Sequence, residues 1–278
     1  VTAQAAGGAT TTVYETALVD GRTELSDPAV NSDTREAVSG TFQVSATDGV
    51  ASVTVLGQTF VPGGPLPQDI NTGYGLLDIT SFVLAADGKS ATVGYTYTLS
   101  DNVLTPPAGI DYFDDIGNGI TVTGVSGASS ASVDLQIRII DDTPLAVNDA
   151  GGTVTEDGAG SLGGNVLDND EAGADKPAVF VSWGADAAAV AALNSYGTLV
   201  RDPSTGDWSY VLDNSRPATQ ALGASFNQTY TLNYTMADAD GDQSTATLTI
   251  TVKGAGDSQT VTAQAAGGAT TTVYETAL

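Results

Sequence analysis

The 278-residue chain carries 33 acidic and eight basic residues and contains no histidine or cysteine, which gives a formal charge of −25. This balance argues against nucleic acid and anionic membranes as partners, because both require a basic surface. Disulfides, zinc sites of Cys and His, and Ser-His-Asp or Cys-His catalysis are excluded as well. No apolar run has the length of a membrane span, so we expect no membrane insertion. Two carboxylates could still act as the catalytic pair of a glycosidase, but we expect that the chain is not an enzyme.

The first 18 residues, VTAQAAGGATTTVYETAL, return unchanged as residues 261–278. Such a repeat indicates a tandem array, in which residues 258–278 begin the next copy. One period is too long for a single small sandwich and fits two domains of ordinary size.

In the first half, apolar and polar residues alternate over 91–100 and 130–140. In the second of these stretches Val133, Leu135, Ile137 and Ile139 share one face. Alternation at every second residue over such stretches predicts strands with one buried face and one solvent-exposed face. We therefore expect a β-sandwich over residues 1–143.

In the second half, two hairpins are predicted, over residues 196–212 and 229–252. The alanine-rich stretch 185–194 predicts either one short helix or an irregular crossover. These elements indicate a β-sandwich over residues 144–257. Between the halves, DDTPLAVND (141–149) predicts a short, stiff boundary. The fold class is therefore all-β, with two antiparallel sandwiches in series within an array.

Acidic loops are the candidate metal sites. Asp238, Asp240 and Asp242 are spaced so that three carboxylates can converge on one hard cation. The twelfth position of this stretch is Thr249, so it is no EF-hand, and a polar hairpin turn is the alternative. Weaker candidates, which could equally be solvated loops, are Asp111, Asp114, Asp115, Asp168, Asp170, Glu171 and Asp175.

Strand order in a sandwich predicts where these acids meet. Glu15 follows the first strand of the first domain, and the adjacent Asp141 and Asp142 follow its last, so all three should lie at one pole. Two like charges side by side in a linker favour a neutralising cation. The acidic loop of the second domain should face this pole. The predicted calcium junction therefore comprises Glu15, Asp141, Asp142, Asn148, Asp149, Asp238, Asp240 and Asp242.

A weaker junction is predicted between one copy and the next. Its acids would be Glu156, Asp157 and Asp257. The facing loop of the following copy would be GVSGASSAS (124–132), which carries no acid and offers fewer ligands.

Several stretches resemble a known class of repeats. TVTEDGAG, GNVLDND, TGDWSYVLDN and YTLNYTMADADGDQSTATLTITV, in this order, resemble the VCBS-like and cadherin-like repeats of large RTX-type bacterial adhesins exported by type I secretion. VYETAL, GTFQVSATDGVASVTV and YTYTLSDNV resemble a related Ig-like repeat of the same proteins. The resemblance implies an extracellular, calcium-dependent rod at the bacterial surface that holds an adhesive tip away from the cell. The acid-free loop 124–132 departs from the pattern and puts a calcium site there in doubt.

The expected function is therefore that of a calcium-rigidified spacer whose partners are neighbouring repeats of the same chain. The alternative is a repeated carbohydrate- or surface-binding module. For this alternative, Trp183 and Trp208 would form a sugar-stacking platform giving a weak glycan contact, whereas core packing is the usual use of such residues.

Overall fold

The computed structural model describes residues 2–5, 11–19, 21, 34–104, 112–158 and 160–256. The described residues of domain one form twelve strands and one short 3-10 helix. They are β1 (Thr2–Ala5), β2 (Thr11–Tyr14), η1 (Glu15–Ala17), β3 (Ala37–Ser45), β4 (Val50–Val55), β5 (Gln58–Phe60), β6 (Ile70–Asn71), β7 (Gly75–Leu84), β8 (Ser90–Leu99), β9 (Tyr112–Asp115), β10 (Asn118–Gly124), β11 (Val133–Asp134) and β12 (Ile137–Ile140).

In domain two, the part of the chain that the structure describes forms seven strands and one α-helix. They are β13 (Asp149–Thr155), β14 (Ser161–Asn165), β15 (Val179–Trp183), α1 (Ala187–Tyr196), β16 (Gly197–Arg201), β17 (Asp207–Leu212), β18 (Asn227–Ala237) and β19 (Gln243–Lys253). Among the described residues, no helix is long and apolar enough to span a membrane.

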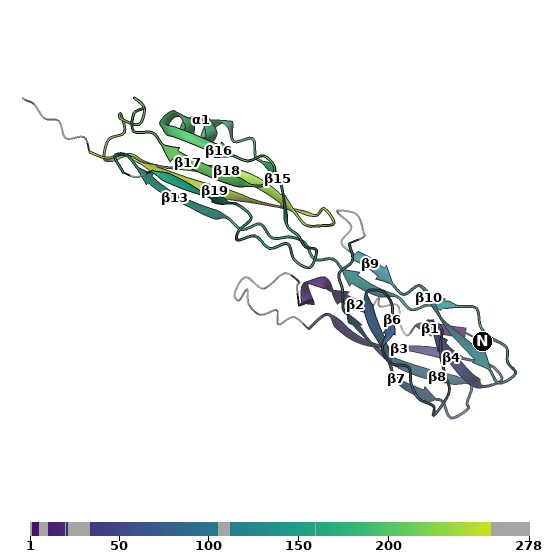
Figure 1. The fold of residues 1–278 in the computed structure, drawn as a ribbon. Coiled ribbons are helices and arrows are strands. Elements are labelled where there is room, and N and C mark those ends of the chain that lie inside the picture. Colours follow the sequence, from purple (N-terminus) through teal and green to yellow (C-terminus); the bar gives the residue numbers. More distant parts are fainter. Residues whose placement is uncertain are drawn as a thin grey trace, which may run out of the picture.

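The sheets confirm the all-β prediction. In domain one the strand orders are β1-β3-β8-β7-β6, β11-β10-β4-β5 and β2-β12-β9; in domain two they are β13-β19-β18-β15 and β14-β17-β16. No described strand of one domain pairs with a strand of the other. The two domains follow each other end to end as a rod, with the segment between β12 and β13 at the narrow middle (Figure 1). The boundary between residues 143 and 144 itself stays a prediction.

Two strand pairs differ from the wholly antiparallel expectation. β2 runs parallel to β12, with Tyr14 opposite Ile140, and β13 runs parallel to β19, with Thr155 opposite Lys253. In domain one the N-terminal segment is divided between two sheets, because β1 pairs with β3 and β2 with β12. The first and last strands of each domain therefore end side by side at the same pole, and this arrangement places the acids that follow them.

Each domain has its own apolar core, built from the alternation seen in the sequence. The hairpin of β18 and β19 is paired continuously from Asn227–Lys253 to Ala237–Gln243. Its inward residues Leu232, Leu248 and Ile250 are fully buried. Regular strands buried on one face keep a single register, because a slip of one residue would expose the whole apolar row. This register places the tip of the hairpin rigidly at one end of domain two.

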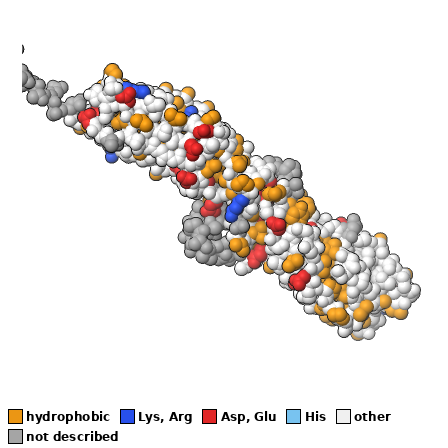
Figure 2. Space-filling model, viewed as in Figure 1, with side chains coloured by type: hydrophobic (Ala, Val, Ile, Leu, Met, Phe, Trp, Pro, Cys, Tyr) orange, Lys and Arg blue, Asp and Glu red, His pale blue; other side chains and the backbone are white. Residues whose placement is uncertain are grey.

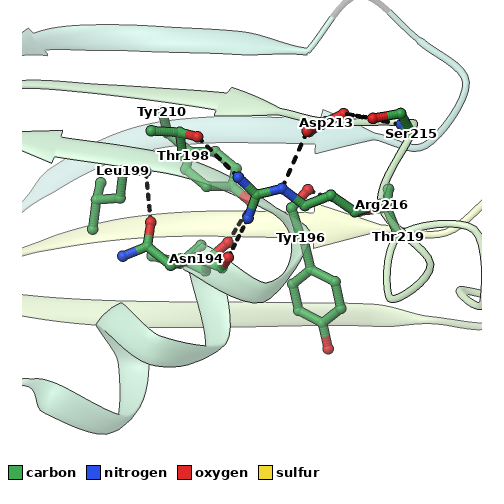
Figure 3. Close-up of polar contacts among 10 residues, drawn as sticks. Asn194, Tyr196, Thr198, Leu199, Tyr210, Asp213, Ser215, Arg216 and Thr219 are labelled. Atoms are coloured by element: carbon green, nitrogen blue, oxygen red, sulfur yellow. Dashed lines mark hydrogen bonds and ion pairs between the residues drawn. The ribbon is translucent and has the colours of Figure 1, made fainter.

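The helix α1 is anchored by an arginine at its C-terminal end. Arg216 donates from Nη1 to the carbonyl of Asn194, from Nη2 to Thr198 Oγ1 at 3.1 Å, and from Nε to Asp213 at 3.2 Å (Figure 3). A cation at the last carbonyls of a helix satisfies them and opposes the negative end of its dipole. The alternative of one short helix is thus the correct one, two residues later than expected, and α1 lies away from domain one (Figure 1).

Candidate metal centre

Glu15 and Asp141 emerge together at the pole of domain one that faces domain two. Tyr14 and Ile140 are partners in the parallel pair of β2 and β12. The next residue on each strand is the acid, Glu15 or Asp141, so both leave the sheet at the same level. The pairing register therefore sets these two carboxylates side by side.

Domain two supplies three further carboxylates to the same place. Asp238 and Asp240 lie in the turn between β18 and β19, and Asp175 lies between β14 and β15. The backbone N–H of Ala239 donates to the carbonyl of Asp175 at 2.9 Å, which ties the two segments together. The turn of this hairpin lies at the end of domain two that meets domain one (Figure 1).

The five acids form two groups of three, one comprising Glu15, Asp141 and Asp175 and the other Asp175, Asp238 and Asp240. In each group, one carboxylate oxygen from every member lies within 4.8 Å of the others. Asp175 belongs to both groups. The arrangement therefore offers two adjacent cation positions bridged by one carboxylate, with ligands from both domains.

Four of these acids are almost completely withdrawn from water. Glu15 and Asp175 have 0% of their surface exposed, Asp238 has 3% and Asp141 has 9%. Buried carboxylate oxygens without a hydrogen-bond donor are Glu15 Oε2, both oxygens of Asp141, Asp175 Oδ2 and Asp238 Oδ2. A buried charged group with no partner is costly, so buried charges are usually paired or bind a metal. These oxygens fit the ligand set of a hard cation.

The remaining oxygens are held in fixed orientations. Val103 N–H donates to Glu15 Oε1 at 2.7 Å, and the side-chain amide of Asn102 donates to Asp175 Oδ1 at 2.5 Å. Asp238 Oδ1 accepts from the N–H groups of Gly241 at 3.1 Å and Asp242 at 2.8 Å. Glu15, Asp175 and Asp238 thus each have one oxygen bound by the protein and another left over. Such pre-organisation reduces the entropy lost when a ligand binds.

Hydrogen bonds cross directly between the domains. Asn102 of domain one donates to Asp175, and Ala174 N–H donates to Asp142 Oδ2 at 3.0 Å. Asp142 therefore lies at the junction as expected, and it holds the backbone beside Asp175.

Electrostatic repulsion within the cluster is reflected in the pKa values of its members. Burial, followed by the charge of Asp175, raises the pKa of Glu15 to about 7. Burial and the charges of Glu15 and Asp240 raise the pKa of Asp141 to about 9. Burial and Asp240 raise the pKa of Asp238 to about 7. A divalent cation would reverse these shifts, because it stabilises the ionised form of every ligand.

Asn148 and Asp149 lie apart from these two groups. Asn148 Oδ1 accepts from Thr247 N–H at 3.0 Å and from Thr247 Oγ1 at 2.9 Å, so it is fastened to β19. Burial, with the charges of Asp170 and Asp168, raises the pKa of Asp149 to about 6. The acids that act on Asp149 therefore come from the segment after β14 and belong to neither group of three.

The other predicted acids belong to neither group of three. Asp242 occupies the hairpin turn, where its N–H caps Asp238. Asp114 binds Arg138 at 2.8 Å, and Asp115 accepts from the hydroxyl of Tyr97 at 2.8 Å. Glu156 and the exposed Asp157 follow β13, whose end is the opposite pole of domain two. Asp111 and Asp257, like the repeated residues 258–278, lie outside the described residues.

Both tryptophans are used in packing. Trp208 is 7% exposed. Trp183 donates from Nε1 to the carbonyl of Asp202 at 2.8 Å and packs against Phe180 and Tyr234, with ring centroids 5.3 and 6.4 Å apart. This geometry favours core packing over a sugar-stacking platform.

Sequence reasoning did not place Asp175 or Asn102 at the junction. In the sequence Asp175 is one of several acids in a loop, and Asn102 has no charge that would mark it as part of an acidic site. The one local signal is the Lys176-Pro177 pair, because proline in this position ends the acidic loop shortly before β15.

Comparison with known proteins gives one family match. Residues 141–254 match the model of the bacterial cadherin-like domain. No curated protein sequence matches the chain. This part of the chain is therefore similar to a cadherin-like repeat, and the match begins at Asp141, one of the junction acids.

Solved structures that match the chain include cadherin and cadherin-like domains. Zebrafish RET cadherin-like domains 1 to 4 share 13% identity over 91% of this chain and 51% of that one, with a TM-score of 0.28. Mouse cadherin-23 EC22-24 shares 13% identity over 74% of this chain and 60% of the cadherin-23 chain, with a TM-score of 0.28. Protocadherin gamma C5 EC1-3 shares 11% identity over 90% of this chain and 67% of the protocadherin chain, with a TM-score of 0.29. The chain spans about half the length of the RET structure.

Proposed function

We propose that the chain is a structural spacer repeat of an extracellular bacterial adhesin, in which calcium locks the two domains end to end. The observation that carries this proposal is the convergence of acids from both domains on Asp175, which belongs to both groups of three. The match of residues 141–254 to the bacterial cadherin-like domain supports a repeat of the adhesion or extender type.

Calcium suits the ligand set better than other common metals. Every candidate ligand is an oxygen, and the chain has no histidine or cysteine to favour zinc or copper. Calcium accepts six to eight oxygens in flexible geometry, whereas magnesium demands a tighter octahedron and keeps more of its water. The five acids, with backbone carbonyls and water, can complete such a shell.

The mechanism is mechanical. Without a cation, repulsion among the buried carboxylates opposes close contact of the two domains, since like charges in a space of low dielectric interact strongly. Calcium would turn the same groups into a bridge from Glu15 and Asp141 in domain one, through Asp175, to the hairpin of domain two. A rod that is stiff at this joint keeps whatever it carries at a distance from its point of attachment.

The acidity of the chain also fits a calcium-dependent fold. Figure 2 shows acidic side chains along the visible face of both domains and few basic ones, in keeping with the formal charge of −25. A protein of high net charge is destabilised by self-repulsion. Extracellular calcium would add stability by binding only the folded state, by about 2.7 kcal/mol per site at a concentration 100 times Kd.

A calcium titration of the full chain tests the proposal. We expect calcium to raise the melting temperature and to lengthen and narrow the distribution of shapes in small-angle scattering. Asp141→Asn should weaken both responses, whereas Asp134→Asn, which removes an equal charge from the exposed face of β11, should not. Magnesium at the same ionic strength controls for screening. A calcium titration that leaves both the melting temperature and the scattering unchanged contradicts the proposal.

A further inference from the structure

In each domain a strand near the N-terminal end lies beside the last strand and runs parallel to it. These terminal pairs are β2 with β12 in domain one and β13 with β19 in domain two. The two domains follow each other end to end (Figure 1), so tension along the chain enters each domain at one end and leaves it at the other. Pulling therefore drives the two strands of a terminal pair in opposite directions along their common axis.

Tension of this kind loads the hydrogen bonds of a parallel pair together. The bonds of a parallel ladder are evenly spaced along the strands. When one strand is drawn past the other, no bond opens ahead of its neighbours, so the pair yields only when several bonds break at once. The resistance of a terminal pair therefore grows with the number of bonds that join its strands.

The terminal pair of domain two is the longer of the two. β13 and β19 are paired at six positions, from Asp149 opposite Leu248 to Thr155 opposite Lys253, with one register shift near the start. At the end of the pair, Glu156 N–H donates to the carbonyl of Lys253 at 2.9 Å and adds one more backbone bond.

Side chains fasten the other end of this pair, where tension from domain one arrives. Asn148 Oδ1 accepts from Thr247 N–H at 3.0 Å and from Thr247 Oγ1 at 2.9 Å, which extends the pair by one position. Thr249 Oγ1 donates to the carbonyl of Asp149 at 3.1 Å. These bonds all join β13, or the residue before it, to β19, and they add to the resistance of the ladder.

The terminal pair of domain one is shorter and receives the load in two stages. β2 and β12 are paired at four positions, Thr11–Tyr14 opposite Ile137–Ile140. The hydroxyl of Thr11 bonds the hydroxyl of Tyr95 on β8, at 2.9 Å, and so does not reach β12. β1 is paired with β3, again at four positions. Because β1 precedes β2 in the chain, these two short pairings bear tension one after the other.

We propose that the repeat is a graded force-bearing element, in which domain one yields at lower tension than domain two. Opening of domain one lengthens the rod and relieves the tension on domain two. Asn148 and Thr249 act as fasteners of the terminal pair of domain two. The inference goes beyond the proposed function, because it follows from strand pairing and holds without calcium.

Single-molecule force spectroscopy of the full chain, held through handles at both termini in EDTA, tests the order. When fully extended, Thr2–Ile140 measures about 500 Å and Asp149–Lys253 about 380 Å, so the length released identifies the domain. We expect the longer release at the lower force. The order should persist in the double variant Glu15→Gln and Asp141→Asn, which removes the repulsion between these two carboxylates at the end of β2 and β12.

Thr249→Val tests the fasteners, with Thr229→Val as the matched control. Thr229 Oγ1 lies 2.8 Å from Thr251 Oγ1 across β18 and β19, a pair that does not join the two pulled ends. Forced unfolding is governed by the unfolding rate. We expect both variants to change the melting temperature alike, but only Thr249→Val to speed the unfolding of domain two at constant force, by about fivefold for one lost hydrogen bond. Asn148→Ala should speed it at least as much.

The inference is overturned if the shorter release comes first, if both releases occur at the same force, or if the order reverses in the double variant. It is also overturned if Thr249→Val and Thr229→Val change the unfolding rate under load equally, since the hydroxyl would then serve only general stability.

Calcium added to the same experiment tests the proposed function separately. An ion bound by Glu15 and Asp141 would join the residues that directly follow β2 and β12, and should raise the force needed to open domain one. An unchanged force would contradict the calcium junction. The order measured in EDTA would still decide the present inference.

Discussion

Replacing Asp175 by asparagine tests the junction most directly, because this residue alone belongs to both groups of acids. The change is nearly isosteric, and the new side-chain oxygen can still accept the hydrogen bond from Asn102. Only the charge shared by the two cation positions is lost. We therefore expect calcium affinity to fall at both positions at once.

The size of the effect follows from binding linkage. Loss of one charged ligand weakens a calcium site by about tenfold, and at saturating calcium this lowers the stabilisation by about 1.4 kcal/mol for each site. Two sites give about 3 kcal/mol, or a fall of about 10 °C in the melting temperature of a domain of this size. Without calcium the sign should reverse or vanish, because the variant no longer buries a carboxylate whose pKa is raised mainly by burial.

Differential scanning calorimetry of the full chain, in EDTA and in saturating calcium, measures both the loss of stability with calcium and the reversed or absent effect without it. Asp134→Asn controls for the change in net charge on an exposed strand. A loss of stability that is equal in EDTA and in calcium would refute the reasoning, since Asp175 would then be a structural residue whose contact with Asn102 is all that matters.

Three further predictions concern the junction and the fold. Without calcium, the free energy of unfolding should fall as pH rises from about 4 to about 9. In the folded state the pKa values of Glu15, Asp141 and Asp238 are raised to about 7, 9 and 7. The folded state therefore binds more protons than the unfolded state in this range, and raising the pH favours unfolding. In saturating calcium, stability should instead fall only as pH drops below about 5 and stay level above it, because the bound cation holds the carboxyl pKa values below their unfolded values, and urea titrations at several pH values measure both profiles. Asp240→Ala should lower the calcium-induced gain in melting temperature and broaden the scattering-derived distance distribution, and unchanged profiles would contradict its place in the cluster. Arg216→Gln should destabilise domain two by about 1 kcal/mol with or without calcium, because the acceptors at the C-terminal end of α1 lose a charged donor, and a calcium-dependent effect in denaturant titrations would contradict a purely structural role.

Local sequence patterns determined most of the fold. Strict alternation in residues 229–252 predicts the β18–β19 hairpin, and the structure confirms it residue by residue. The Asp202–Gly206 turn likewise predicts the pairing of β16 with β17. These features are accessible because strand periodicity and turn chemistry act over a few neighbouring residues. The absence of histidine and cysteine similarly left only oxygen ligands for a metal site.

The sequence also indicated that Glu15 and Asp141 share a pole, since both follow strands at the ends of one domain. It could not show that Asp175 joins Asp238 and Asp240, because these residues lie in separate loops of domain two that only the packed sandwich brings together. Nor could it separate Asn148 and Asp149 from the junction, because their partners, Thr247 and Asp170, are distant in sequence. Which acids are exposed and which are buried without a donor depends on contacts between two folded domains. The tertiary structure alone therefore decided which of the many acids form the candidate site.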